Sequence, residues 1–139
     1  MARPSTSDLT PRELAVMRVF WDLAASKKRS PEQLTADETR EALERAGESL
    51  AYPTVANVVR GLVEKGYLSQ HGEKRPFYFS PAKAFEDVAN HLVSDLVKRL
   101  FSGSREAMLV HLLDRRRLTK AERSYLQSLL QEDGSDERN

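Results

Sequence analysis

Apolar residues recur every three or four positions over three stretches in the first half of the chain, which is the period of a helix with one buried face. The first stretch follows Thr10 and the second follows Thr35. Each threonine has a glutamate three residues later, a pair that caps a helix start reciprocally. The third stretch opens beside Pro53 and stops before Gly66, residue types that favour helix starts and helix ends. The pattern predicts three short helices.

The third predicted helix has one apolar face and one small, nearly uncharged polar face. Short polar side chains leave room for close contact with another surface, although an ordinary solvent-exposed helix has the same pattern. The apolar face consists of Val55, Val58, Val59 and Leu62, and the polar face consists of Thr54, Asn57, Arg60 and Gly61.

From Tyr67 onwards the period changes from helical to alternating, which predicts a β-hairpin with strands at 67–71 and 77–81. The connecting loop contains glycine, proline, Lys74 and Arg75. A lone hairpin is marginally stable, so we expect it to pack on the three helices. Three helices followed by a hairpin is the element order of a winged helix-turn-helix domain, with the hairpin as the wing.

The second half of the chain again shows helical periodicity, over 85–100, 108–113 and 119–130. Thr119 and Glu122 repeat the capping pair at the start of the last stretch. Helices this short have little core of their own, so we expect their apolar faces to pack against a second copy of the chain. Folding back onto the first domain is the alternative. The expected dimerisation residues are Phe85, Val88, Leu92, Leu96, Leu100, Leu109, Leu112 and Leu126.

The predicted fold class is therefore mainly α with a small β-hairpin, a winged helix-turn-helix domain followed by a helical dimerisation region. We expect a disordered N-terminus at 1–8, the winged-helix domain at 9–82, the dimerisation region at 83–131 and a disordered tail at 132–139.

Composition narrows the function classes. Hydrophobic residues make up 40% and charged residues 31% of the 139 residues, as in soluble folded proteins, and we expect a cytoplasmic location with no membrane partner. The chain has no cysteine, and His71, His91 and His111 are scattered without metal-ligand or catalytic spacing. We therefore expect no enzyme activity, no metal and no cofactor. The net charge of +1 does not identify a partner, although residues 51–80 contain four basic and two acidic residues.

Several motifs in order resemble the BlaI/MecI/CopY family of penicillinase-type repressors, over residues 9–130. The matching segments are 14–21, the start of the third helix at 51–55, its end at 65–68, the returning wing strand at 75–81 and a break at 101–104.

This resemblance implies a homodimeric transcriptional repressor that binds an operator dyad in double-stranded DNA. In such a dimer two reading helices enter successive major grooves about 34–36 Å apart. By matching positions, Tyr52, Thr54 and Asn57 are expected at the bases or the groove edge, since asparagine pairs well with adenine. The residues expected mainly at phosphates are Arg60, Lys74 and Arg75.

The sequence departs from the family pattern at Pro53, Asn57 and Gly61, so the operator is expected to differ from the family's usual one. The Asn-Phe bond that is cut in members answering β-lactam sensors aligns with His111-Leu112, so that mode of induction does not carry over. An upstream sensor or protease stays open as a further partner. The second function class is a winged-helix adaptor between proteins without DNA binding, which salt-independent or absent binding to duplex DNA would favour.

Overall fold

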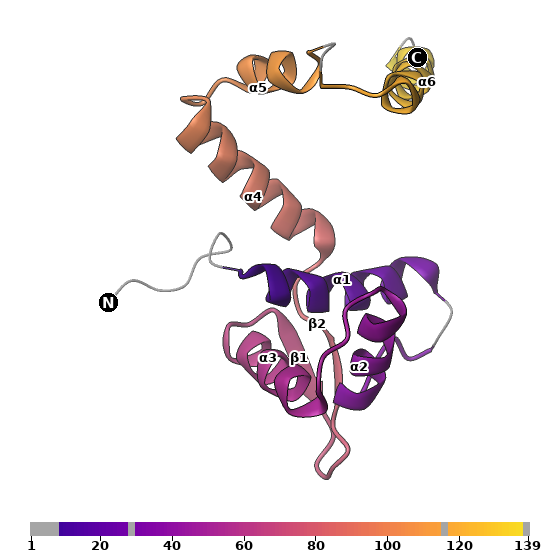
Figure 1. Cartoon of the computed structure of the whole chain (residues 1–139), viewed down its shortest axis with the longest axis vertical. Helices are drawn as coiled ribbons and strands as arrows, with labels where there is room; N and C mark the ends of the chain where they lie inside the picture. Colours follow the sequence, from indigo (N-terminus) through magenta and orange to yellow (C-terminus); the bar gives the residue numbers. More distant parts are fainter. Residues whose placement is uncertain (1–8, 28–29, 115–116, 138–139) are drawn as a thin grey trace. The chain divides into compact units, whose positions relative to one another are not determined.

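The computed structural model describes residues 9–27, 30–114 and 117–137, with side chains as far as residue 131. The N-terminus at 1–8 and the last two residues of the expected tail lie outside the described residues. Within them the fold is mainly helical with one small hairpin, as predicted (Figure 1). In chain order the elements are α1 Pro11–Ser26, α2 Ala36–Arg45, α3 Tyr52–Glu64, β1 Leu68–His71, β2 Tyr78–Pro81, α4 Phe85–Leu100, α5 Arg105–Leu112 and α6 Lys120–Glu137.

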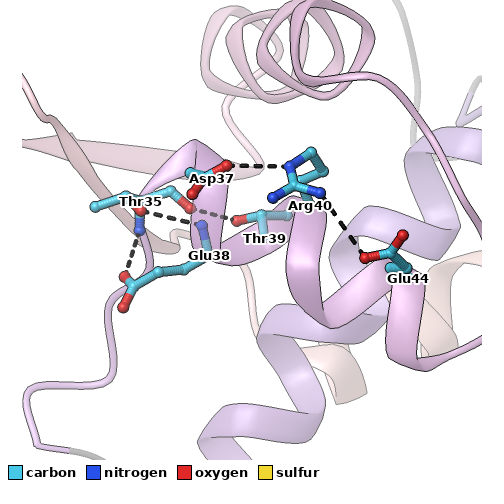
Figure 2. Close-up of polar contacts among 6 residues, drawn as sticks. All are labelled: Thr35, Asp37, Glu38, Thr39, Arg40 and Glu44. Atoms are coloured by element: carbon cyan, nitrogen blue, oxygen red, sulfur yellow. Dashed lines mark hydrogen bonds and ion pairs between the residues drawn. The ribbon is translucent and has the colours of Figure 1, made fainter.

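Each of the three predicted capping boxes is present. Thr10 accepts a hydrogen bond from the Glu13 backbone N–H at 3.1 Å, and Glu13 accepts one from the Thr10 N–H at 2.8 Å. Thr35 and Glu38 repeat this exchange at the start of α2, as Figure 2 shows. Thr119 and Glu122 exchange the same two hydrogen bonds at the start of α6. These local sequences therefore set where α1, α2 and α6 begin.

The third helix is bounded close to its predicted ends. It begins at Tyr52, one residue earlier than expected, and Pro53 occupies the first turn, where a missing N–H leaves no hydrogen bond unmade. Its N-cap, Ala51, contributes no side-chain bond. Gly66 has a φ of 85°, the left-handed conformation that ends a helix and that other residues adopt at a cost.

The core of the first unit lies where α1, α2, α3 and the hairpin meet. Trp21 belongs to this core, and its indole N–H donates to the Lys83 carbonyl oxygen at 3.0 Å. Val58 is only half-buried. The side chains with least exposure are Phe20, Met17, Leu43, Leu62, Val16, Val55, Val59, Val88 and Thr39.

The hairpin pairs antiparallel from Leu68 opposite Pro81 to His71 opposite Tyr78. A further backbone pair was not predicted: Leu34 and Phe79 exchange two N–H···O hydrogen bonds of 3.0 and 2.8 Å. This pair ties the linker between α1 and α2 to the returning strand of the wing. In Figure 1 the loop of the hairpin extends past α2 and α3.

The chain divides into two compact units between Val93 and Ser94, inside α4, whereas the sequence placed the domain boundary at residue 82. The first turns of α4 belong to the first unit because Val88 is buried in its core and the Phe85 ring packs edge-on against Trp21, with centroids 5.3 Å apart.

In the second unit, described by itself, few side chains are shielded. Val97 is buried, α5 has no buried residue, and the rings of Phe101 and His111 lie 5.9 Å apart. Gly103 closes α4 with an N–H bond to the Val97 carbonyl. Helix α6 continues to Glu137, beyond the expected end of ordered structure at residue 131.

Candidate nucleic-acid interface

The outer face of α3 carries the predicted base-reading residues. Val55, Val59 and Leu62 are buried, which fixes the rotation of the helix about its axis. Tyr52 is consequently 51% exposed, Asn57 is exposed and Thr54 is half-buried. The face is free of acidic side chains until Glu64, at the end of the helix.

Asn57 and Arg60 lie one turn apart on this face and touch each other. An Arg60 N–H donates to the Asn57 side-chain carbonyl oxygen over 3.4 Å, a long and exposed hydrogen bond. Such a weak bond is readily exchanged for contacts to DNA, so both side chains remain available.

A groove of about 520 Å³ separates α3 from the wing and from the start of α2. It brings together Tyr52, Arg60 and Arg75, three of the six residues predicted to touch DNA. Thr54, Asn57 and Lys74 lie outside it; Lys74 is exposed in the hairpin loop. The lining residues are Thr35, Ala36, Asp37, Tyr52, Ala56, Arg60, Gln70, Arg75, Pro76, Phe77 and Phe79.

Three polar residues of this groove were not predicted to lie at the DNA interface: the α2 cap Thr35, and Asp37 and Gln70. Gln70 is exposed although it stands two positions after the buried Leu68, on the same side of β1, so strict alternation along the strand would have placed it toward the core. Asp37 stands in the first turn of α2 and carried no signal beyond helix capping. With Arg60 and Arg75 on the opposite sides, Asp37 makes the groove one of mixed charge with an excess of positive charge.

An ion pair between α1 and α3 supports the orientation of the reading helix. Lys65 Nζ lies 3.0 and 2.9 Å from the two carboxylate oxygens of Glu13, and both side chains are largely shielded. Burial raises the pKa of Glu13, but hydrogen bonds from the Thr10 N–H and from Lys65 outweigh it and lower the pKa below its usual value. Lys65 is thus engaged within the fold, and Glu13 serves both the α1 cap and this bridge.

The eight predicted dimerisation residues fall into different environments. Phe85 is 47% exposed beside Trp21, Leu92 packs partly against the core of the first unit, and Val88 is 2% exposed within it. Val88 therefore has almost no surface to offer a partner. In the second unit Leu126 is half-buried. The exposed members there are Leu96, Leu100, Leu109 and Leu112.

The family profile described as "Penicillinase repressor" matches residues 9–132, which includes the whole winged-helix unit. The chain belongs to the penicillinase repressor family. The resemblance seen in the sequence motifs is thereby confirmed, and family membership identifies the protein as a DNA-binding transcriptional repressor and not an enzyme.

Individual relatives agree with this membership. The repressor is 34% identical over 104 residues to the transcriptional regulator BlaI of Mycobacterium tuberculosis, from strain CDC 1551 / Oshkosh and from strain ATCC 25618 / H37Rv. The aligned region covers 74% of this chain and 70% of each relative. Among solved structures, the complex structure of hsRosR-S1 matches with a TM-score of 0.50 at 17% identity, covering 94% of this chain and 96% of that one. At that identity the likeness concerns the fold alone.

Two further observations apply to the described part of the repressor. None of the helices described there is long and apolar enough to cross a membrane. Across residues 9–27, 30–114 and 117–137 no three His, Asp or Glu side chains gather where a metal ion could be held.

Proposed function

We propose that the repressor binds an operator dyad as a homodimer, with α3 of each copy in a major groove and the wing against the sugar–phosphate backbone. The proposed placement of α3 and the wing on DNA is supported by the groove between them, with Arg60 on one side and Arg75 on the other. A DNA strand that follows the groove meets a guanidinium on each side, while Asn57 projects beside it toward base edges.

Residue roles follow from these positions. Asn57 is the proposed direct base reader, Tyr52 and Thr54 contact bases or the groove edge, and Arg60, Lys74 and Arg75 contact phosphates. Arg60 and Arg75 are separated by the groove, so they are suited to phosphates of the same strand on either side of it. This division predicts that losing a phosphate contact weakens all duplexes alike, whereas losing Asn57 changes sequence preference.

The proposed dimer rests on the exposed apolar side chains of the second unit. Leu100 is 66% exposed, Leu109 is 50% exposed and Leu112 is 52% exposed. A short helical unit that exposes such side chains in a single chain gains stability when a second copy covers them. Two-fold symmetry then supplies two reading helices, and two modest half-site affinities combine into one operator affinity.

The nature of an inducing signal is a separate question. The peptide bond between His111 and Leu112, aligned with the family's cleavage site, lies in the last turn of α5. Proteases prefer exposed, extended segments, so cutting here requires the end of α5 to unwind first.

We propose a cytoplasmic site of action, which a repressor of chromosomal promoters needs.

Selection of bound duplexes from a random DNA pool with the purified full chain tests the reading function directly. We expect enriched sequences with two inverted half-sites spaced by about one helical turn, 10–10.5 bp. Affinity for the selected duplex should fall steeply as salt rises, because phosphate binding releases counterions. An adaptor without DNA binding would enrich no sequence, and that outcome would contradict the proposal.

A further inference from the structure

The start of α2 places a carboxylate in the groove proposed to receive DNA. Asp37 lines this groove together with Arg60 of α3 and Arg75 of the wing loop. Among the groove-lining residues that the structure describes, Asp37 carries the one negative charge. A phosphate that is attracted by the two guanidinium groups therefore also approaches a group of its own sign.

Asp37 is only partly neutralised within the protein. Arg40 donates from Nε to Asp37 Oδ1 at 3.0 Å, and its Nη1 lies 3.9 Å from a carboxylate oxygen of Glu44, so two carboxylates share one guanidinium (Figure 2). Asp37 stays 57% exposed and Glu44 59% exposed, whereas Arg40 is 29% exposed. This group of three keeps one net negative charge, and its groove-lining member is Asp37.

We propose that Asp37 limits the sequence-independent affinity of the repressor for DNA by repelling the sugar–phosphate backbone in this groove. The inference rests on the function proposed above. Operators share a genome with a vast excess of other sites, so weak backbone attraction leaves residence on the DNA dependent on base contacts. Arg60 and Arg75 supply the attraction, and Asp37 offsets part of it.

The test measures binding of the full chain to the selected operator and to a random-sequence duplex at several salt concentrations. Replacing Asp37 by Asn removes the charge with little change in shape. We expect about 2–5-fold tighter binding to both duplexes at low salt, as one charge removed several ångströms from a phosphate predicts, and a smaller gain as salt rises. Base preference in the selected pool should not change.

Matched variants separate repulsion in the groove from other effects. Glu44→Gln removes the same charge from the same helix and from the same guanidinium but outside the groove, so we expect less than half of the Asp37→Asn effect on the logarithm of affinity. Asp37→Glu keeps the charge and should bind as the wild type does. Asp37→Ser is a second neutral variant that fits the first turn of a helix, in case Asn disturbs folding.

The inference is overturned if Asp37→Asn and Asp37→Ser bind no more tightly than the wild type, or if Glu44→Gln matches them. A change in preference at one base pair would also overturn it, because Asp37 would then be a base reader. Failure of the wild type to bind any duplex would contradict the proposed function itself, so the two failures are distinguishable.

Discussion

The two units of the repressor use the same kind of amphipathic helix in opposite ways. In the first unit three helices and a hairpin enclose fully buried side chains such as Phe20 and Leu62. In the second unit α5 buries no residue, and Leu100 and Val110 are 66% and 72% exposed. The same apolar spacing therefore yields a closed core in one unit and an open surface in the other. The difference teaches that periodicity identifies a face to be covered but not what covers it.

The largest effect on stability should come from removing a large side chain from the closed core of the first unit. Phe20→Ala is expected to lower the unfolding free energy of the first unit by about 3–5 kcal/mol, since it leaves a cavity among fully buried neighbours. Fluorescence of Trp21, the single tryptophan, follows that unit during denaturation. Leu113→Ala is the control in the second unit, where Leu113 is 44% exposed, and should leave the Trp21 transition unchanged. If both variants shifted the Trp21 unfolding transition equally, the closed core of the first unit would not be the main source of its stability.

A charge on the open surface should act on association and not on folding. Leu100→Asp is expected to weaken the dimer by about 3 kcal/mol, because symmetry places two unpaired charges in an apolar contact. Ser94→Asp adds the same charge at an exposed polar position of α4 about 120° around the helix from Leu100, and it should leave the dimer intact. Sedimentation across a concentration series measures both variants. An undiminished Leu100→Asp dimer would mean that this surface is not where two copies meet.

A substitution on the exposed polar face of α3 should leave both units folded and the dimer intact. Asn57→Ala is expected to alter preference at one operator base pair by about 1–3 kcal/mol, as the loss of a direct reader does. Competition binding with operators changed one base pair at a time measures it. Arg75→Ala is the comparison, expected to weaken every duplex to a similar degree. If Asn57→Ala also weakened all duplexes evenly, Asn57 would be no base reader.

The smallest effect concerns the bridge between α1 and α3. Glu13→Gln is expected to cost about 1 kcal/mol at neutral pH through loss of the charged bond to Lys65. The pKa of Glu13 is lowered from 4.5 in the folded state, so its stabilisation is present above that pH and lost as pH falls through the folded-state pKa. Wild-type stability should therefore fall more than that of the variant below pH 4.5, by denaturant titration at several pH values. Parallel curves would exclude this pair as a source of acid sensitivity.

Local signals predicted local structure well. The Thr10, Thr35 and Thr119 caps, the left-handed Gly66 and the hairpin strands each depend on residues close in the sequence, and each is present. The family was also recognisable, because several short motifs occur in a fixed order.

Contacts between segments far apart in the sequence could not be predicted from such local patterns. Lys65 and Glu13 are 52 positions apart, and the single pair of Leu34 with Phe79 is too short to leave a period. Val88 shows the same limit within a helix: its spacing matched Leu92 and Leu96, but the side chain turns into the core of its own unit. The groove likewise combines α2, α3 and the wing, so Asp37 could be placed in it only once the three were packed.

The backbone pair between Leu34 and Phe79 has one more consequence. Both N–H groups are bonded to the opposite carbonyl, so each exchanges its hydrogen with heavy water only when the strand and the linker separate. The exchange rates of these two amide hydrogens therefore measure how often the wing separates from the linker. Phe79 lines the groove, but neither Leu34 nor Phe79 is among the residues proposed to contact DNA, so their exchange can be followed in the free and the DNA-bound repressor without altering any of those residues.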